Sequence, residues 1–290
     1  TIQMMYWIYC RRNFAECRYS FKIENEIFKN MFGFAGWNFL TTCASMLSTQ
    51  GVSILLNMQF GPVINAARGV ASQINGTVGA FHRNFTTALN PQITKTYAAE
   101  DFEYVKKLVC KGAKFSYLAF FFIALPCMIE INFFLSVWLK EVPAFAGIFV
   151  QLTLLNSLVE VLLNSSETLN RATGKIRNFQ LIVSAAQFAI LIASYIALKV
   201  TANPILVVAM ANIMYLLIFA PRILVNKPYV GMTFGYYYKE VLQGIIMMSV
   251  ISAALSLLPL MFMSDGWLRL ITVGLISSIT IIITLSLIHI

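Results

Sequence analysis

The sequence predicts an all-α protein that crosses a membrane several times, and two observations lead to this fold class. Hydrophobic residues make up 59% of the 290 residues, charged residues only 11%, and the mean hydropathy is +0.74, which is far from the composition of a soluble globular chain. Apolar stretches long enough for a membrane-spanning helix also recur along the chain, separated by short polar segments. We therefore expect a polytopic membrane protein of the all-α class.

The expected helices follow one another with short connections. Residues 1–9, with the run MMYWIYC, predict the end of a transmembrane helix whose start lies before this sequence. Because of this incomplete first helix, we interpret the chain as the C-terminal portion of a longer protein. Residues 10–30 form the longest polar connection and predict a linker on the cytoplasmic side. The predicted spans are 31–56, 63–94, 113–138, 143–168, 178–199, 203–225, 241–263 and 267–289.

Basic residues orient these spans, because loops rich in lysine and arginine lie on the cytoplasmic side. The opposite loops hold only Lys140, Lys199 and Arg269. This distribution accounts for the net charge of +9 and argues against a nucleic-acid partner, since the basic residues lie between apolar runs and not on a soluble surface. The loops of the basic side contain Arg11, Arg12, Arg18, Lys22, Lys29, Lys95, Lys106, Lys107, Lys111, Lys114, Arg171, Lys175, Arg177, Arg222, Lys227 and Lys239.

The stretch from Gly61 to Asp101 is unusual for a membrane span because it carries Arg68, His82 and Arg83. At about 100° of rotation per residue, its polar and cationic residues gather on one arc of a helix. An arginine facing lipid at the bilayer centre costs about 2.5–3.5 kcal/mol even on the more lenient insertion scale. We therefore expect this arc to line a cavity, the alternatives being arginines that snorkel to an interface and a histidine that only packs. The arc consists of Asn65, Arg68, Ser72, Asn75, Gly79, His82, Arg83, Thr86 and Asn90.

Two acidic residues lie inside predicted spans and are expected to have a role there. Glu130 follows Pro126 by four residues, and Glu160 lies near the middle of its span. A cavity lined by the polar stripes of two helices would pair Glu160 with Arg68 or Arg83. The alternative is that Glu130 and Glu160 stay unpaired and couple transport to a proton gradient. The second stripe consists of Thr153, Asn156, Ser157, Glu160, Asn164 and Glu167.

Prolines inside two predicted spans suggest helices that bend beside a cavity. Pro91 and Pro126 each free a backbone carbonyl one turn earlier in the helix. Kinked helices of this kind suit a transporter that rocks between inward-open and outward-open forms. The alternative is that membrane helices tolerate proline without such a role.

No residue pattern in the sequence predicts an enzyme, a cofactor or a metal site. The five cysteines form no CxxC pair and have no histidine at ligand spacing, and the sequence contains no GxxxxGK[ST] loop for phosphate. Serine, histidine and aspartate do not converge in a recognisable catalytic motif. Energy for transport would therefore come from an ion gradient, the membrane potential or the flow of substrate.

Three stretches carry a resemblance to a known family. They are YCRRNFAEC at Tyr9 to Cys17, FGFAGWNF soon after it, and GPVINAARGVASQINGTVGAFHRNFTTALNPQITKTYAAED from Gly61. The chain resembles the O-antigen and capsule flippases of the multidrug/oligosaccharidyl-lipid/polysaccharide exporter superfamily. The resemblance implies two six-helix lobes that face each other, with residues 31–225 as the second lobe, residues 226–290 as two added helices, and the first lobe outside this chain.

The resemblance also implies a substrate and a location. Such a transporter flips an undecaprenyl-pyrophosphate-linked oligosaccharide across the bacterial cytoplasmic (inner) membrane by alternating access, for lipopolysaccharide and capsule synthesis, alongside polysaccharide polymerase and assembly proteins. Arg68 and Arg83 are then candidates for the pyrophosphate, because arginine offers a bidentate fork to phosphate. The candidates for sugar hydroxyls in the same cavity are Asn65, Ser72, Asn75 and Asn90, with His82 beside them.

Two other functions stay open on the sequence alone. A cation-coupled multidrug antiporter of the same superfamily would have a more acidic cavity, which Glu130 and Glu160 keep possible. A membrane polysaccharide polymerase or ligase is disfavoured, because such enzymes are expected to carry a large outer loop and the outer loops here are short.

Overall fold

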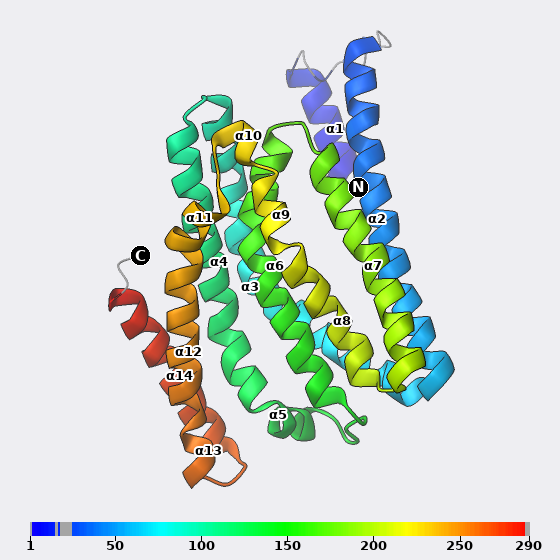
Figure 1. Ribbon diagram of the computed structural model, residues 1–290. Helices are drawn as coiled ribbons and strands as arrows, with labels where there is room; N and C mark the ends of the chain where they lie inside the picture. Colours follow the sequence, from blue (N-terminus) through cyan, green and yellow to red (C-terminus); the bar gives the residue numbers. More distant parts are fainter. Residues whose placement is uncertain (1, 15–16, 18–24, 288–290) are drawn as a thin grey trace. The chain divides into compact units, whose positions relative to one another are not determined.

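The computed structural model describes residues 2–14, 17 and 25–287, and this part of the chain is helical and contains no strand (Figure 1). The chain divides into two compact units, residues 1–36 and residues 37–290. The expected all-α class is confirmed. The helices are α1 (Ile2–Asn13), α2 (Asn25–Phe60), α3 (Pro62–Ala98), α4 (Phe102–Ile129), α5 (Ile131–Trp138), α6 (Ala146–Ala172), α7 (Arg177–Thr201), α8 (Pro204–Leu217), α9 (Phe219–Leu224), α10 (Lys227–Val230), α11 (Phe234–Tyr237), a π-helical turn (Tyr238–Leu242), α12 (Gln243–Leu257), α13 (Pro259–Phe262) and α14 (Trp267–Leu287).

Within the described residues, seven helical stretches are long and apolar enough to cross a membrane, which confirms a multi-pass membrane protein. α3 is not among them although it has 37 residues. Arg68, His82, Arg83 and the amides between them make α3 too polar, so its passage through a membrane stays a prediction. The seven stretches are Asn25–Phe60, Phe102–Ile129, Ala146–Ala172, Arg177–Thr201, Pro204–Val230, Phe234–Phe262 and Trp267–Thr284.

The expected linker over residues 10–30 falls partly outside the described part of the chain. Residues 15–16 and 18–24 are not described, so no structure is assigned to Arg18 or Lys22. The described residues on either side are helical, because α1 continues to Asn13 and α2 begins at Asn25. The expected lobe over 31–225 and the added pair over 226–290 stay predictions.

The predicted span 113–138 is two helices, and its break is not at the proline. α4 begins at Phe102, where Asp101 caps it by accepting a hydrogen bond from the Tyr104 amide (3.0 Å). α4 continues through Pro126 and ends at Ile129, and α5 starts after Glu130. The four lysines expected in the preceding loop, between positions 106 and 114, are therefore helical. α3 likewise runs through Pro91 without interruption.

The predicted span 203–225 is also divided. α8 ends at Leu217, and the short helix α9 that follows contains Pro221 and Arg222. Arg222, expected in a cytoplasmic loop, is buried with only 4% of its surface exposed. The hydropathy pattern thus placed this cation wrongly, and its surroundings are described below with the site.

The interior of the second unit is built around α3, α4 and α6, each of which packs against the other two. Phe120 of α4 and Phe149, Leu154 and Leu163 of α6 are fully buried there. α7 packs on α8, and α8 contacts α6; α12 and α14 pack together and both contact α4. α8 and α7 therefore extend the second unit beyond α6, and α12 and α14 extend it beyond α4.

α2 and α7 lie side by side within the second unit. The Thr41 and Ser184 hydroxyls are 3.0 Å apart, and the Gln180 side-chain amide donates to Asn38 Oδ1 (2.8 Å). Gly51 allows a close approach further along, since a Cβ there would lie 2.6 Å from Leu191 Cδ1. Small and polar residues at a contact are typical of helix packing in membranes.

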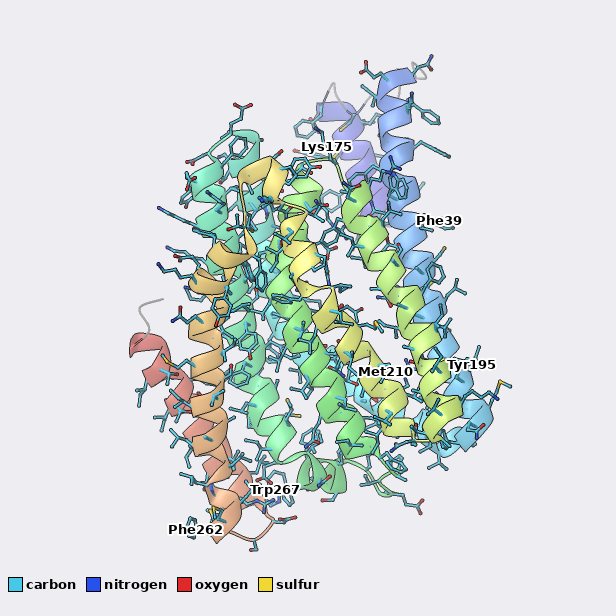
Figure 2. All side chains as sticks on the ribbon, viewed as in Figure 1. Phe39, Lys175, Tyr195, Met210, Phe262 and Trp267 are labelled. Carbon is cyan, nitrogen blue, oxygen red and sulfur yellow. The ribbon has the colours of Figure 1, made fainter. Side chains whose placement is uncertain are left out.

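The outer surface of the second unit is apolar, as a lipid-facing surface requires. Figure 2 shows Lys175 near one end of this unit and Trp267 near the opposite end. Tyr195, Trp267 and Phe262 are exposed, and Phe262 has 84% of its surface accessible. Exposed aromatic side chains of this kind, and a basic residue at the other end, fit a membrane boundary.

Candidate functional site

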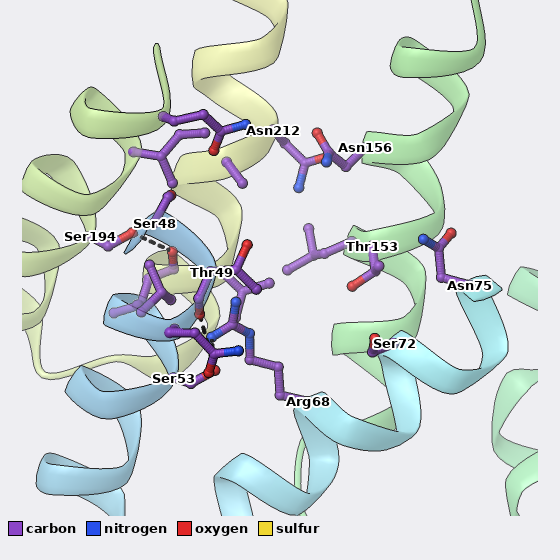
Figure 3. A pocket seen from close by; sticks show the side chains of 18 of the residues that line it. Ser48, Thr49, Ser53, Arg68, Ser72, Asn75, Thr153, Asn156, Ser194 and Asn212 are labelled. Atoms are coloured by element: carbon purple, nitrogen blue, oxygen red, sulfur yellow. Dashed lines mark hydrogen bonds between the residues drawn. The ribbon is translucent and has the colours of Figure 1, made fainter. Parts of the chain in front are cut away.

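A polar cavity of the second unit, called the main cavity below, has a volume of about 580 Å³ and lies among α2, α3, α6, α7 and α8 (Figure 3). Its apolar lining is limited to Val52, Leu152, Ile190, Val207, Val208 and Ala211 together with Gly69. Hydroxyl and amide side chains outnumber the apolar ones, so the cavity suits a ligand with many hydrogen-bonding groups. The polar lining consists of Ser48, Thr49, Gln50, Ser53, Asn65, Arg68, Ser72, Asn75, Thr153, Asn156, Gln187, Ser194, Asn212 and Tyr215.

α3 contributes four of the residues expected to face a cavity. Asn65, Arg68, Ser72 and Asn75 follow one another at intervals of three or four residues, which places them on the same face of the helix. α3 begins at Pro62, directly after Gly61 at φ 79°, and the proline sits in the first turn, where its missing N–H leaves no helical bond unmade. The first turns of α3 thus present this polar face to the cavity.

Arg68 is the only charged side chain among the cavity-lining residues. Its Nη1 donates a hydrogen bond to Ser53 Oγ of α2 at 2.7 Å (Figure 3). A guanidinium has five N–H donors, and within the described part of the chain Arg68 makes no other hydrogen bond or ion pair. Several donors therefore remain for a ligand in the cavity.

Two amide oxygens in the cavity wall have no partner. Asn75 Oδ1 of α3 and Asn156 Oδ1 of α6 are buried and make no hydrogen bond to any described residue. A buried polar group left unsatisfied costs about 1–3 kcal/mol. A ligand or water that donates hydrogen bonds would remove this cost, so the cavity offers acceptors as well as the donors of Arg68.

Arg83, also expected to face the cavity, does not line it. Its side chain is exposed and lies back along α3, where Nη2 donates to the Gly76 carbonyl at 2.8 Å. Gly79 leaves room for this position, since a Cβ there would lie 2.7 Å from Arg83 Nη1. The expected pairing of Arg83 with a glutamate is not present: none of the described carboxylates forms an ion pair with it.

His82 and Asn90 also lie outside the cavity, in the contact between α3 and its neighbours. His82 is buried, with Nε2 at 3.3 Å from Asn164 Nδ2 and its ring edge-on to Phe120 at 5.5 Å between centroids. Asn90 Oδ1 accepts a hydrogen bond from Thr168 at 2.9 Å. In this arrangement both residues hold α3 against α4 and α6.

Glu130 forms an ion pair, with a partner that sequence reasoning did not identify. Arg269 of α14 donates from Nε and Nη2 to its two carboxylate oxygens, each at 2.8 Å. Arg269 also pairs with Asp265 at 2.5 Å. Glu130 is 1% exposed, so this is a buried bidentate pair of the geometrically strong kind. Arg269, expected in an outer loop, lies in the first turn of α14.

Glu160 is not paired with Arg68 or Arg83. It is half-buried and lies within hydrogen-bonding range of the Tyr215 hydroxyl, which also accepts a bond from Gln187 Nε2 at 2.8 Å. Tyr215 and Gln187 both line the main cavity. Glu160 is therefore connected to the cavity through one neutral side chain, and the expected pairing with an arginine of α3 was wrong.

A further ion-pair group lies at the other end of α6. The Arg222 side chain lies over the Phe179 ring at 5.2 Å, and its Nη2 is 3.3 Å from Glu167 Oε2. Glu167 Oε1 also accepts a bond from Arg171 at 2.7 Å. In the sequence, the signal that Arg222 is buried is its position inside the apolar run FAPRIL, between Phe219 and Ile223.

The polar stripe expected on α6 divides between two faces of the helix. Asn164 contacts His82 of α3, and Thr168, which was not part of the predicted stripe, contacts Asn90, whereas Glu160 and Glu167 point to α8 and α9. The lower-numbered members of the stripe, Thr153 and Asn156, line the main cavity. The stripe is thus partly cavity wall and partly interhelical contact.

Comparisons of the chain with protein-family models, with curated proteins and with solved structures found no match. No cluster of three or more histidine, cysteine, aspartate or glutamate side chains that could hold a metal ion occurs in the described ranges. What the cavity binds therefore has to follow from its lining, which offers one arginine with free donors, unpartnered amide oxygens and many hydroxyls.

Proposed function

We propose that this chain forms part of a membrane transporter that flips an oligosaccharide linked to undecaprenyl pyrophosphate across the bacterial cytoplasmic membrane, for polysaccharide synthesis. The observation that carries the proposal is the polar cavity around Arg68. In a protein whose outer surface is apolar, a cavity of about 580 Å³ lined mainly by hydroxyls and amides is suited to a hydrated, hydroxyl-rich cargo.

The physical task is to move a sugar chain and its anionic linkage past hydrocarbon. Hydration lost on entering the membrane has to be replaced by fixed hydrogen-bonding groups, because unsatisfied polar groups are costly in a low-dielectric interior. The serine, threonine and asparagine side chains of the cavity offer donors and acceptors for sugar hydroxyls. The lipid tail stays outside, where the apolar surface of the helices contacts the bilayer.

Arg68 supplies the contact for the anionic group. Its guanidinium is held by Ser53 and keeps donors free for a bidentate bond to phosphate. Arg83 points away from this cavity and is therefore not part of the anion site that we propose. The two-lobe architecture implied by the family resemblance would provide the opposite wall.

A cation-coupled multidrug antiporter is the second candidate, and one observation bears on it. Glu160 reaches the cavity through Tyr215. No carboxylate is among the lining residues, however, and Arg68 would repel a cation. An anionic cargo is therefore the better fit.

The test is the flipping of a fluorescent lipid-linked oligosaccharide by the full-length protein in proteoliposomes. We expect Arg68→Ala to slow flipping about 10- to 100-fold, the range of a charge-assisted hydrogen bond of about 1.5–3 kcal/mol, and Arg68→Lys to restore part of the rate. Arg83→Ala, at the exposed arginine of the same helix, is the matched control and should flip normally.

Two results would count against the proposal. Normal flipping by Arg68→Ala would show that the anion site lies elsewhere. Absence of flipping by the wild type, together with export of a cationic dye, would favour the antiporter.

A further inference from the structure

A second cavity, of about 360 Å³, lies between α2, α6 and α7 in the same unit. Like the main cavity it is lined by hydroxyl and amide groups. Unlike the main cavity, it is lined by both an acidic and a basic side chain. The polar lining that matters here consists of Thr41, Thr42, Ser45, Glu167, Arg171 and Gln180.

Residues that line the two cavities lie close to one another on α2 and α7. Ser45 lines the second cavity and Ser48 lines the main cavity, so they are about one turn, or ~5 Å, apart on α2. On α7, Val183 and Gln187 have the same relation. A continuous series of lining residues therefore runs along these two helices from the main cavity to the second one.

The charges that line the second cavity are already paired. Arg171 donates from Nε and Nη2 to Glu167 Oε1, at 3.2 and 2.7 Å. Glu167 also binds Arg222, which is buried and does not line the cavity. An anion entering here would meet a cation that is already paired with a carboxylate, whereas Arg68 in the main cavity has no carboxylate partner among the described residues. A neutral ligand could accept from Arg171 and donate to Glu167 without breaking the pair.

The remaining lining completes a site for a sugar ring. Met46 of α2 and Val183 of α7 add apolar surface for the C–H face of a ring, whereas Phe179 is 2% exposed and its ring lies under Arg222. The hydroxyls of Thr42 and Ser45 lie on α2, and the Gln180 amide lies on α7. Apolar surface with a few well-placed polar groups is what small-molecule sites have in common.

We propose that the second cavity is a subsite for uncharged sugar residues of the same lipid-linked chain whose anionic group binds at Arg68. This inference rests on the proposed function and adds to it a division of the ligand: charge in the main cavity, neutral sugar in the second. The second cavity lies toward the end of the unit where α6 ends and α7 begins, which is the basic end of the helices.

The test compares two cargoes in proteoliposomes with the full-length protein. One is undecaprenyl pyrophosphate carrying a neutral oligosaccharide, and the other is the same lipid carrying a single neutral sugar. Ser45→Trp fills the second cavity, and Leu47→Trp, at an exposed position of α2 outside both linings, is the matched control. Ser45→Ala removes the hydroxyl without filling the cavity.

We expect Ser45→Trp to slow flipping of the oligosaccharide about tenfold or more and to leave the single-sugar lipid within about twofold of wild type. Ser45→Ala should slow the oligosaccharide about threefold, as the loss of one hydrogen bond predicts. Leu47→Trp should flip both cargoes normally.

The subsite is disproved if Ser45→Trp flips the oligosaccharide as well as Leu47→Trp does, or if it slows both cargoes equally. In either case the wild type still flips the lipids, so the proposed function stands. A wild type that flips neither cargo overturns the proposed function and the subsite together.

Discussion

The two halves of α3 have similar side chains but different neighbours. The half that begins at Pro62 has α2 and α8 across the main cavity, and there Arg68 and Asn75 face open volume. The half that ends at Ala98 packs against α4 and α6, and there His82 and Asn90 contact other side chains. Arg68 and Asn75 in the first half are thus available to a ligand, whereas His82 and Asn90 in the second half hold helices together.

The largest effect on flipping is expected from a substitution that fills the main cavity beside the first half of α3. Ser72→Trp places a large ring in the main cavity and should reduce flipping to background, because the cargo and the indole cannot occupy the same space. Thr87→Trp, at an exposed site in the second half, is the control and should flip normally. Flipping in proteoliposomes, normalised to folded protein, measures both. Equal loss in both variants would show that the halves do not differ in this way.

A smaller effect, on stability, is expected in the second half. His82→Ala removes the ring contact with Phe120 and the bond with Asn164 and leaves a space in the interior, so we expect it to lower the free energy of unfolding by about 2 kcal/mol. Thermal unfolding in detergent would report this loss. Gln73→Ala, at an exposed position on the same helix, should unfold like wild type. An unchanged melting temperature for His82→Ala would contradict its packing role.

The smallest effect compares two asparagines. Asn90→Ala loses the hydrogen bond from Thr168 and should cost about 1 kcal/mol of stability. Asn75→Ala removes an oxygen that has no partner, so it should cause no loss of stability while weakening ligand binding. Denaturation and ligand-binding measurements on both variants separate these outcomes. A larger stability loss for Asn75→Ala than for Asn90→Ala would reverse the comparison.

The helical class and the polar face of α3 could be predicted from the sequence because both follow from local patterns. Composition and the spacing of apolar runs predict membrane helices, and a period of 3.6 residues places Arg68, Ser72 and Asn75 on one face. Where along the helix that face meets a cavity could not be predicted. It depends on α2 and α8, whose positions beside the first half are a matter of tertiary packing.

Buried cations were the other limit of sequence reasoning. Arg222 and Arg269 were counted with the loop residues, since each lies near the end of a predicted span. In the structure each is held by a carboxylate from a distant part of the chain, Glu167 and Glu130 respectively. The partner of Glu130 is 139 residues away, and nothing in the local sequence identifies such a pair.

The Glu130–Arg269 pair has a consequence for how the protein is made. Glu130 is synthesised and inserted well before α14, so during synthesis its carboxylate has no arginine to pair with until Arg269 arrives. Removing one partner of a buried ion pair costs about 3–5 kcal/mol. A chain that stops before α14 would keep that cost permanently, which gives a membrane quality-control protease a physical difference by which to tell unfinished copies from finished ones.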